Sequence, residues 1–201
     1  MSIRYNNNIP AEIAQLQLCR ALKNCGSSVE NHFQQSTAKD LSIYDNDTEK
    51  YTQWREASPT STKEFHVSNP NSKNIVLLPL DNKILTGKSI TKNGVADCAL
   101  LTMKELTFIE FKTNVESGTE FNVNDKLKEA KGQLLNTYSN IKNQCSNINI
   151  DIEENHNIDF YIVFNKDLQV TNANNIFMNF QVEFAKQNKK ALYIDNYKQY
   201  T

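Results

Sequence analysis

The apolar positions of the chain form helical stripes and short continuous runs, most clearly from residue 74 onwards. Apolar residues spaced three and four apart predict helices, and unbroken apolar runs between turn residues predict buried strands. Helices are expected over residues 10–24, about 124–142 and about 172–188, and strands over 74–80, 95–102, 106–112, 159–165 and 191–195. This order predicts an α/β protein with a mixed sheet (α+β) that helices cover on both faces.

The stretch between the first helix and residue 74 is polar and rich in turn-forming residues. Residues 27–35 are expected to form a second short helix or to continue the first helix after a kink. A further short helix is predicted from Asp47 to about Ala57, with a polar residue as its cap. We expect the whole chain, residues 1–201, to be one domain in which residues 26–73 are a poorly defined elaboration.

Three charged residues, Asp97, Glu110 and Lys112, stand among apolar residues of the second and third predicted strands. A charge in an apolar strand is costly unless it is paired or bound to a metal. Side chains alternate along a strand, so Glu110 and Lys112 share one face, and a hairpin brings Asp97 beside Glu110. The alternative is a half-exposed edge hairpin whose charges face water. Apolar residues on both faces of the third strand favour burial.

Two carboxylates suit Mg²⁺, which binds one or two protein carboxylates together with water and the phosphate of its substrate. We expect Asp97 and Glu110 to bind the ion, with the backbone carbonyl of Phe111 also facing it, and we expect Mn²⁺ to substitute. The ion would polarise a scissile phosphate and lower the pKa of a bound water. Lys112 would orient that water or stabilise the developing negative charge. The pattern therefore predicts a metal-dependent phosphodiester hydrolase.

The segment from Asp97 to Glu110-Phe-Lys112 resembles the PD-(D/E)xK nuclease superfamily, which includes type II restriction enzymes. The resemblance covers roughly residues 74–165 together with the first helix. It implies a restriction-endonuclease-like αβββαβ core, here with an additional C-terminal helix-strand pair. It also implies a magnesium-dependent endonuclease that acts on DNA in restriction, repair or phage defence. Ala96 precedes Asp97, where proline is common in the superfamily.

Further site residues follow from the same resemblance. Many members carry a glutamine on the helix after the third strand, and Gln133 takes that place as a supporting catalytic residue. Thr137 lies one turn later, where RecB-like members have tyrosine, and Lys126 lies two turns earlier and faces the proposed site. Some members add a glutamate from the first helix, for which Glu12 and Glu30 are both candidates.

The charge balance limits how this protein could bind nucleic acid. The chain has 22 Lys and Arg against 23 Asp and Glu, a formal net charge of −1, whereas non-specific nucleic-acid binders are usually basic. A nucleic-acid role must therefore depend on a local groove, a bound metal, or a second subunit, so a homodimer or a partner protein is expected. The alternative is a non-catalytic, nuclease-like regulatory subunit, such as an immunity or antitoxin-like partner. RNA is a further possible substrate.

The cysteines and the apolar runs bear on location. The 4 cysteines form no CxxC pair, which favours reduced, buried thiols in the cytoplasm. The longest apolar run is too short to cross a bilayer, and no signal-peptide pattern is visible near the start. We expect a cytoplasmic protein without membrane contact.

Overall fold

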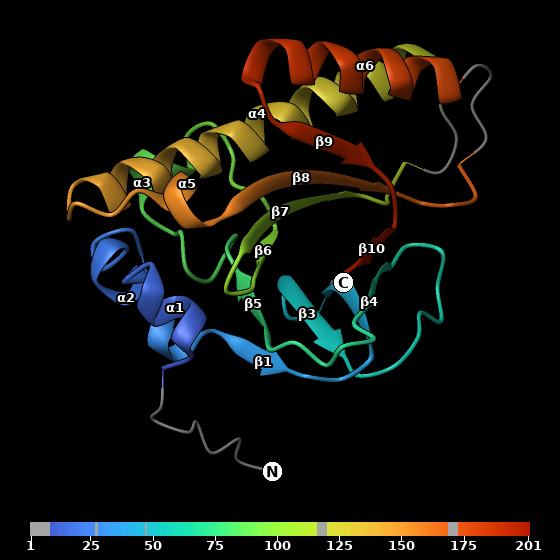
Figure 1. The fold of residues 1–201 in the computed structure, drawn as a ribbon. Helices are drawn as coiled ribbons and strands as arrows, with labels where there is room; N and C mark the ends of the chain where they lie inside the picture. The colour runs from blue at the N-terminus through green and yellow to red at the C-terminus, as the bar shows by residue number, and fades with distance from the viewer. Residues whose placement is uncertain (1–8, 27, 47, 116–119, 169–172) are drawn as a thin grey trace.

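The computed structural model describes residues 9–26, 28–46, 48–115, 120–168 and 173–201. Its centre is a six-stranded sheet in the order β1-β5-β6-β7-β8-β9. Helices pack on one face of this sheet, and a four-stranded sheet in the order β10-β4-β2-β3 packs on the other (Figure 1). The large sheet contains both antiparallel and parallel pairs, so the predicted mixed α/β class is confirmed.

The elements have the following bounds. The strands of the large sheet are β1 (Gln34–Ser36), β5 (Ile75–Pro79), β6 (Cys98–Leu101), β7 (Glu105–Lys112), β8 (Asn157–Phe164) and β9 (Ala191–Ile194). Those of the small sheet are β2 (Asp40–Asn46), β3 (Tyr51–Arg55), β4 (Phe65–Ser68) and β10 (Tyr197–Gln199). The helices are α1 (Ala11–Gln15), α2 (Leu18–Ala21), a 3₁₀ turn (Val29–Asn31), α3 (Lys88–Thr91), α4 (Glu120–Ser146), α5 (Ile152–Asn155) and α6 (Ala173–Asn188).

Strands β5, β6 and β7 form an antiparallel meander. The turn between β6 and β7 is closed by the N–H of Thr102, which donates to the carbonyl of Glu105 over 2.9 Å. Strands β8 and β9 then add in parallel, β8 after helices α4 and α5 and β9 after α6, because a parallel connection needs a long crossover. Both β7 and β8 are buried along most of their length because both faces of the sheet are covered. The five strands predicted from residue 74 onwards are all present.

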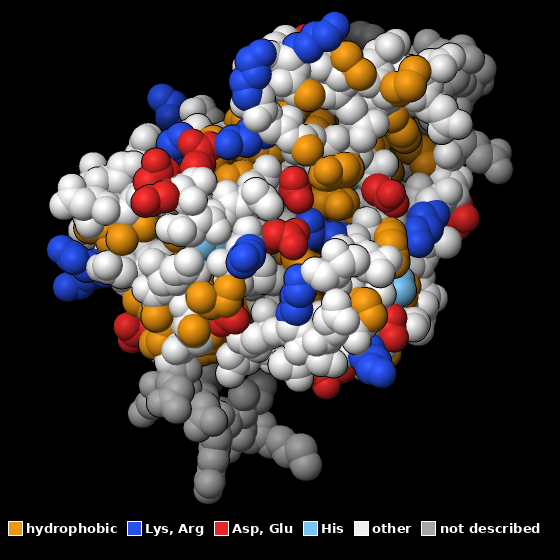
Figure 2. Space-filling view, in the orientation of Figure 1, with side chains coloured by type: hydrophobic (Ala, Val, Ile, Leu, Met, Phe, Trp, Pro, Cys, Tyr) orange, Lys and Arg blue, Asp and Glu red, His pale blue; other side chains and the backbone are white. Residues whose placement is uncertain are grey.

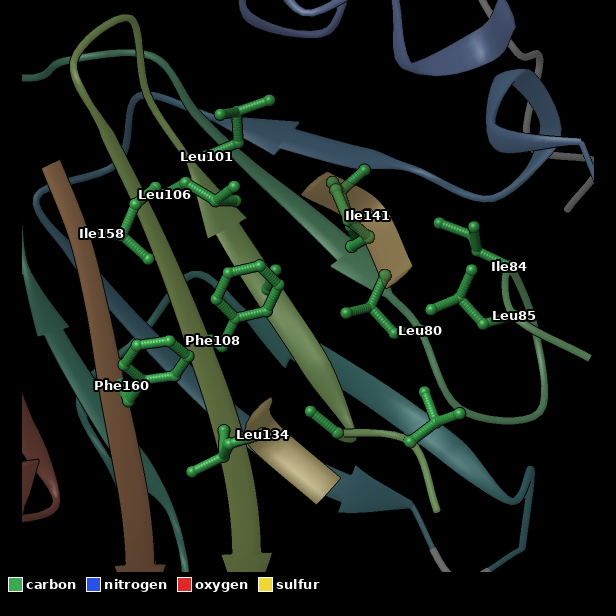
Figure 3. Packing of buried hydrophobic residues seen from close by; sticks show 14 of the residues in the cluster. Leu80, Ile84, Leu85, Leu101, Leu106, Phe108, Leu134, Ile141, Ile158 and Phe160 are labelled. Carbon is green, nitrogen blue, oxygen red and sulfur yellow. The ribbon is translucent and has the colours of Figure 1, made fainter. Parts of the chain in front are cut away.

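Helix α4 supplies much of the core on the helical face. Leu134 and Ile141 of this helix belong to the same buried cluster as Phe108 of β7 and Phe160 of β8 (Figure 3). The two phenylalanine rings stack with their centroids 5.6 Å apart. Full burial of one such side chain contributes about 1.5–3 kcal/mol, which is why this stripe fixes α4 against β7 and β8. The helix runs from 120 to 146, longer than the predicted 124–142.

The prediction of helices on both faces is wrong. The second face is covered by the small sheet, in which Leu41, Ile43, Phe65 and Val67 point inward at every second position. Apolar residues at every second position are typical of a strand with one buried face. Strands β2 and β4 therefore bury one face of the small sheet against the large sheet. The helix predicted from Asp47 to Ala57 is also wrong: Tyr51–Arg55 is strand β3, while residue 47 lies outside the described residues.

The first predicted helix is interrupted. Gln17 has a φ of 47°, in the left-handed region, so residues 10–24 form the two short helices α1 and α2 instead of one. Residues 28–35 form a 3₁₀ turn and the start of β1. Helix α6 begins at Ala173, and residue 172, with which a helix is predicted to begin, lies outside the described part of the chain.

Candidate active site

The three charged residues of the central hairpin meet at one end of β6 and β7. Cys98 pairs with Ile109, so Asp97, just before β6, stands opposite Glu110. The Oδ2 atom of Asp97 accepts a hydrogen bond of 2.6 Å from the backbone N–H of Phe111. Glu110 and Lys112 alternate with Phe111 and therefore lie on the same face as Phe108, toward helix α4. Asp97, Glu110 and Lys112 are thus brought together, as the strand alternation predicts.

Lys112 is buried, with 6% of its surface exposed, and its ammonium is surrounded by acceptors. Its Nζ atom lies 2.8 Å from Oε1 of Glu110 on the same strand. It also donates to Oε1 of Glu129 and Oε1 of Gln133 on α4, each over 2.8 Å. Gln133, expected as a supporting residue, therefore contacts the lysine directly. Glu129 was not a predicted site residue.

Burial disfavours the charged forms of both acids of the site. Burial raises the pKa of Asp97 to about 7, although the hydrogen bond from Phe111 opposes the rise. Burial, and then the charge of Asp97, raise the pKa of Glu110 well above its usual value. Burial lowers the pKa of Lys112, but the charges and hydrogen bonds of Glu110 and Glu129 have the larger combined effect and raise it. Two neighbouring acids thus both have a raised pKa, a pattern typical of functional sites.

One oxygen of this cluster stands out. Glu110 is 2% exposed, and its Oε2 atom has no hydrogen-bond partner among the described residues. A buried carboxylate oxygen without a donor is costly, and a bound cation is one way in which proteins offset that cost.

Helix α4 also fixes the chain segment that leads into Asp97. The Thr137 hydroxyl accepts a hydrogen bond of 2.7 Å from the N–H of Ala96, and Asn136 donates to the carbonyl of Gly94 over 2.6 Å. Gly94 has a φ of 78°, and a Cβ atom there would lie 2.6 Å from Cγ of Gln133, so glycine is required on both counts. Thr137, named as an accessory residue, supports the backbone before Asp97.

Two further aspartates lie around Asp97. A pocket of about 140 Å³ is lined by Asp45, Asp81 and Asp97, together with Lys50 and Tyr51 among others. Asp81 lies two residues after the end of β5, and its N–H donates to the carbonyl of Asp97 over 3.3 Å. Asp45 ends the inward row of strand β2. The position of Asp81 just after a predicted strand is a sequence signal for a site residue, whereas Asp45 belongs to strand β2, which the sequence does not predict.

The two N-terminal glutamates lie elsewhere. Glu12 on α1 accepts a hydrogen bond of 3.0 Å from Asn74, which precedes β5 at the end of that strand remote from Asp97. Glu30 lies in the 3₁₀ turn and interacts with Cys19. Burial is the larger cause of the raised pKa of the Cys19 thiol, and the charge of Glu30 is the second. The other accessory candidate, Lys126, reaches the cluster indirectly, through an ion pair of 2.7 Å with Glu129.

The possible metal ligands are few. In the described ranges no group of three or more His, Cys, Asp or Glu side chains is arranged to hold a metal ion. Asp97 and Glu110 are two carboxylates, the number that Mg²⁺ commonly takes from a protein when substrate and water complete its shell. The expected role of the Phe111 carbonyl stays a prediction.

Neither the family models, the curated proteins nor the solved structures yield a match to this chain. Among the described residues, no helix combines the length and apolarity that a membrane crossing requires. The function of this protein is therefore inferred from the geometry of the site.

Proposed function

We propose that this protein is a divalent-metal-dependent nuclease with a PD-(D/E)xK active site and a restriction-endonuclease-like core. The order of α1 and α2, β5, β6, β7, α4 and β8 supports the fold part of the proposal. Asp97, Glu110, Lys112 and Gln133, gathered at one end of β6 and β7, support the chemical part.

The observation that carries the proposal is the carboxylate of Glu110. One of its oxygens is paired with Lys112, while the other is buried without a donor among the described residues, beside the second acid. A core built only for stability would place a donor or an apolar group there, because an orphaned buried polar atom costs about 1–3 kcal/mol. A cation shared by Glu110 and Asp97 would supply the missing partner.

The residues divide the chemistry among themselves. Asp97 and Glu110 would hold Mg²⁺ or Mn²⁺, which when bound polarises the scissile phosphate and acidifies a water molecule. The Phe111 N–H orients the carboxylate of Asp97. Lys112 places its positive charge near the phosphate, where negative charge develops. The pKa of Asp97 near 7 means that the ion and a proton compete for this carboxylate, so ion affinity is expected to rise with pH.

The expected substrate is DNA, with RNA as the alternative. Basic and acidic side chains are interspersed on the face of the protein seen in Figure 2, without a broad basic field on that face. Binding is therefore proposed to depend on the metal ion and on a second subunit, either another copy of this chain or a partner protein.

The direct test is cleavage of labelled DNA and RNA strands in Mg²⁺ or Mn²⁺ by the wild type and by Glu110→Ala. We expect the wild type to cleave and Glu110→Ala to be inactive with an undiminished melting temperature, because the substitution removes a buried acid. Glu154→Ala, at an exposed glutamate of α5, is the matched control and should retain activity. Full activity in Glu110→Ala would overturn the mechanism.

A non-catalytic role is the second candidate, and one observation favours it. All three donors of the Lys112 ammonium are engaged by protein acceptors, as in a purely structural cluster. Titration with Mn²⁺ separates the two candidates, since an ion that binds only the folded protein raises its melting temperature. A regulatory subunit without a metal site should show no such shift.

A further inference from the structure

Lys112 has as many acceptors as donors, and this balance limits what it can do. A lysine ammonium has three N–H donors, and here they meet Oε1 of Glu110, Glu129 and Gln133, all at 2.8 Å. In this arrangement no donor remains for a phosphate or a water. One of the three acceptors must give way before Lys112 can act on a substrate.

The three acceptors differ in how readily they can be replaced. Gln133 is neutral and is wedged against Gly94, with its amide nitrogen 3.4 Å from the carbonyl of Val95. Glu110 is the acid for which a divalent cation would compete with the lysine. Glu129 lies on the rim: its side chain is 47% exposed, and its second oxygen is paired with Lys126 over 2.7 Å.

The contacts of Glu129 favour its ionised form. Hydrogen bonds from Lys112 and Lys126 hold the pKa of this carboxyl below its usual value. Glu129 is therefore an anion with two ammonium neighbours, one from its own helix and one from strand β7. An ordinary surface pair along a helix would involve Lys126 alone, and the bond to Lys112 connects α4 to the acids of the site.

We infer that Glu129 is a positioning residue that holds Lys112 beside the site when a divalent cation takes Glu110. This inference rests on the proposed function. With Glu129 present, the lysine that loses Glu110 keeps an anionic partner. Without it, Lys112 either stays on Glu110 and competes with the cation or loses its fixed place. Glu129 thus increases the affinity for the cation and keeps the Lys112 ammonium in a fixed position beside the site.

The test measures Mn²⁺ affinity by calorimetry in the full-length protein. Glu129→Gln keeps the size of the side chain and removes its charge, and we expect Mn²⁺ to bind about tenfold more weakly, as for outer-shell partners of metal ligands. Asp125→Asn is the control, because it removes the same charge from the same helix at a position that pairs only distantly with Lys128, over 3.9 Å. Its affinity should equal that of the wild type.

A double-mutant cycle shows whether Glu129 acts through Lys112. In the Lys112→Ala background, Glu129→Gln should cause no further loss of Mn²⁺ affinity. An equal loss in both backgrounds, or no loss in either, overturns the inference, because the effect would then be absent or due to charge alone. In cleavage assays Glu129→Gln should lower kcat and leave KM for the oligonucleotide unchanged. An unchanged kcat also counts against it.

The proposed function and this inference fail differently. If the wild type neither binds Mn²⁺ nor cleaves, the nuclease proposal falls and the role of Glu129 falls with it. If the wild type does both and Glu129→Gln behaves like the wild type, only the role of Glu129 is refuted.

Discussion

Two buried lysines at opposite ends of strand β7 show how differently the same residue can be used. Lys112 is the last residue of β7 and is 6% exposed. Lys198 belongs to β10, is 7% exposed, and pairs with Glu105, the first residue of β7. Lys198 lies 2.9 Å from Glu105 and 3.0 Å from Asp159, and the rings of Tyr161 and Tyr200 lie within 5.6 Å of its Nζ. Each lysine therefore has two carboxylate neighbours within 3.0 Å.

The acids around the two lysines differ. The carboxylates beside Lys198 keep some contact with solvent, with side chains 23% and 20% exposed. Beside Lys112, Glu110 is almost fully buried and faces a second acid, Asp97, and burial is the main cause that raises the pKa of each carboxyl. A lysine balanced by accessible acids fastens β10 to the sheet. An excess of buried acid beside a lysine is the arrangement on which the proposed cation site depends, so the burial of a charge alone does not identify a functional site.

The largest expected effect is on activity at Lys112. Lys112→Met should reduce cleavage by about 10²–10³-fold, the loss typical when one group that stabilises the transition state is removed. Its melting temperature at pH 6 should stay near that of the wild type, because Glu110 can take up a proton in place of the lysine charge. Steady-state cleavage rates and calorimetry would measure both. A variant that has a clearly lowered melting temperature at pH 6 and cleaves at the wild-type rate would reverse the comparison.

Lys198→Met should show the opposite pattern. Removal of one partner of a fully buried ion pair costs about 3–5 kcal/mol, and because Glu105 and Asp159 are partly exposed we expect about 2 kcal/mol here. The melting temperature should fall by about 4–8 °C. Cleavage below the melting temperature should be unchanged. Lys186→Met, at an exposed position of α6, controls for the loss of a lysine as such.

We expect the stability of the protein to depend on pH mainly through the acids near Lys112, above all Asp97. The folded-state pKa of Asp97 is about 7, above an unfolded value of about 3.9, so the protonated carboxyl favours the folded state. That contribution is complete below about pH 4 and is lost as the pH rises through 7. Without divalent ions, the wild type should be about 1.4 kcal/mol more stable at pH 6 than at pH 8 through this group.

Urea unfolding at pH 6 and pH 8 checks this dependence. In Asp97→Asn, the difference in stability between pH 6 and pH 8 should become smaller because the contribution of Asp97 is lost. A difference in the same direction should remain, because the pKa of Glu110 is also raised. Asp125→Asn should keep the whole slope. Greater stability at pH 8 than at pH 6 in the wild type would contradict the assignment.

The smallest effect is expected at Thr137. Thr137→Val keeps the shape of the side chain but removes the acceptor for the N–H of Ala96, so unfolding should become easier by about 1 kcal/mol. Because that N–H belongs to the residue before Asp97, Mn²⁺ affinity should also weaken. Thr137→Ser retains the hydroxyl and should match the wild type in both. Identical behaviour of the valine and serine variants would show that the bond does not position Asp97.

Five strands and two helices from residue 74 onwards follow from the sequence pattern alone, as does the meeting of Asp97, Glu110 and Lys112. Long apolar runs and a strict helical stripe leave few alternatives, and strand alternation places residues two apart on one face. The position of Gln133 beside Lys112 followed from the resemblance to a nuclease core.

The cover of the second face of the large sheet, by contrast, depends on long-range packing. Residues 40–68 carry their apolar side chains in short alternating groups between polar turns, and such groups become strands only when a facing sheet buries them, as Leu41 and Phe65 are buried here. The same holds for β10, three residues that pair with β4 from the far end of the chain. The break at Gln17 is likewise a packing result.

The role of Glu129 and the positions of Asp45 and Asp81 also had to come from the structure. Glu129 sits in a helical segment of mixed charge, and its sequence neighbours suggest only a pair with Lys126. Its contact with Lys112 spans seventeen residues and exists because α4 packs on β7. Local sequence sets which face of an element is apolar, and packing of distant elements sets which charges meet.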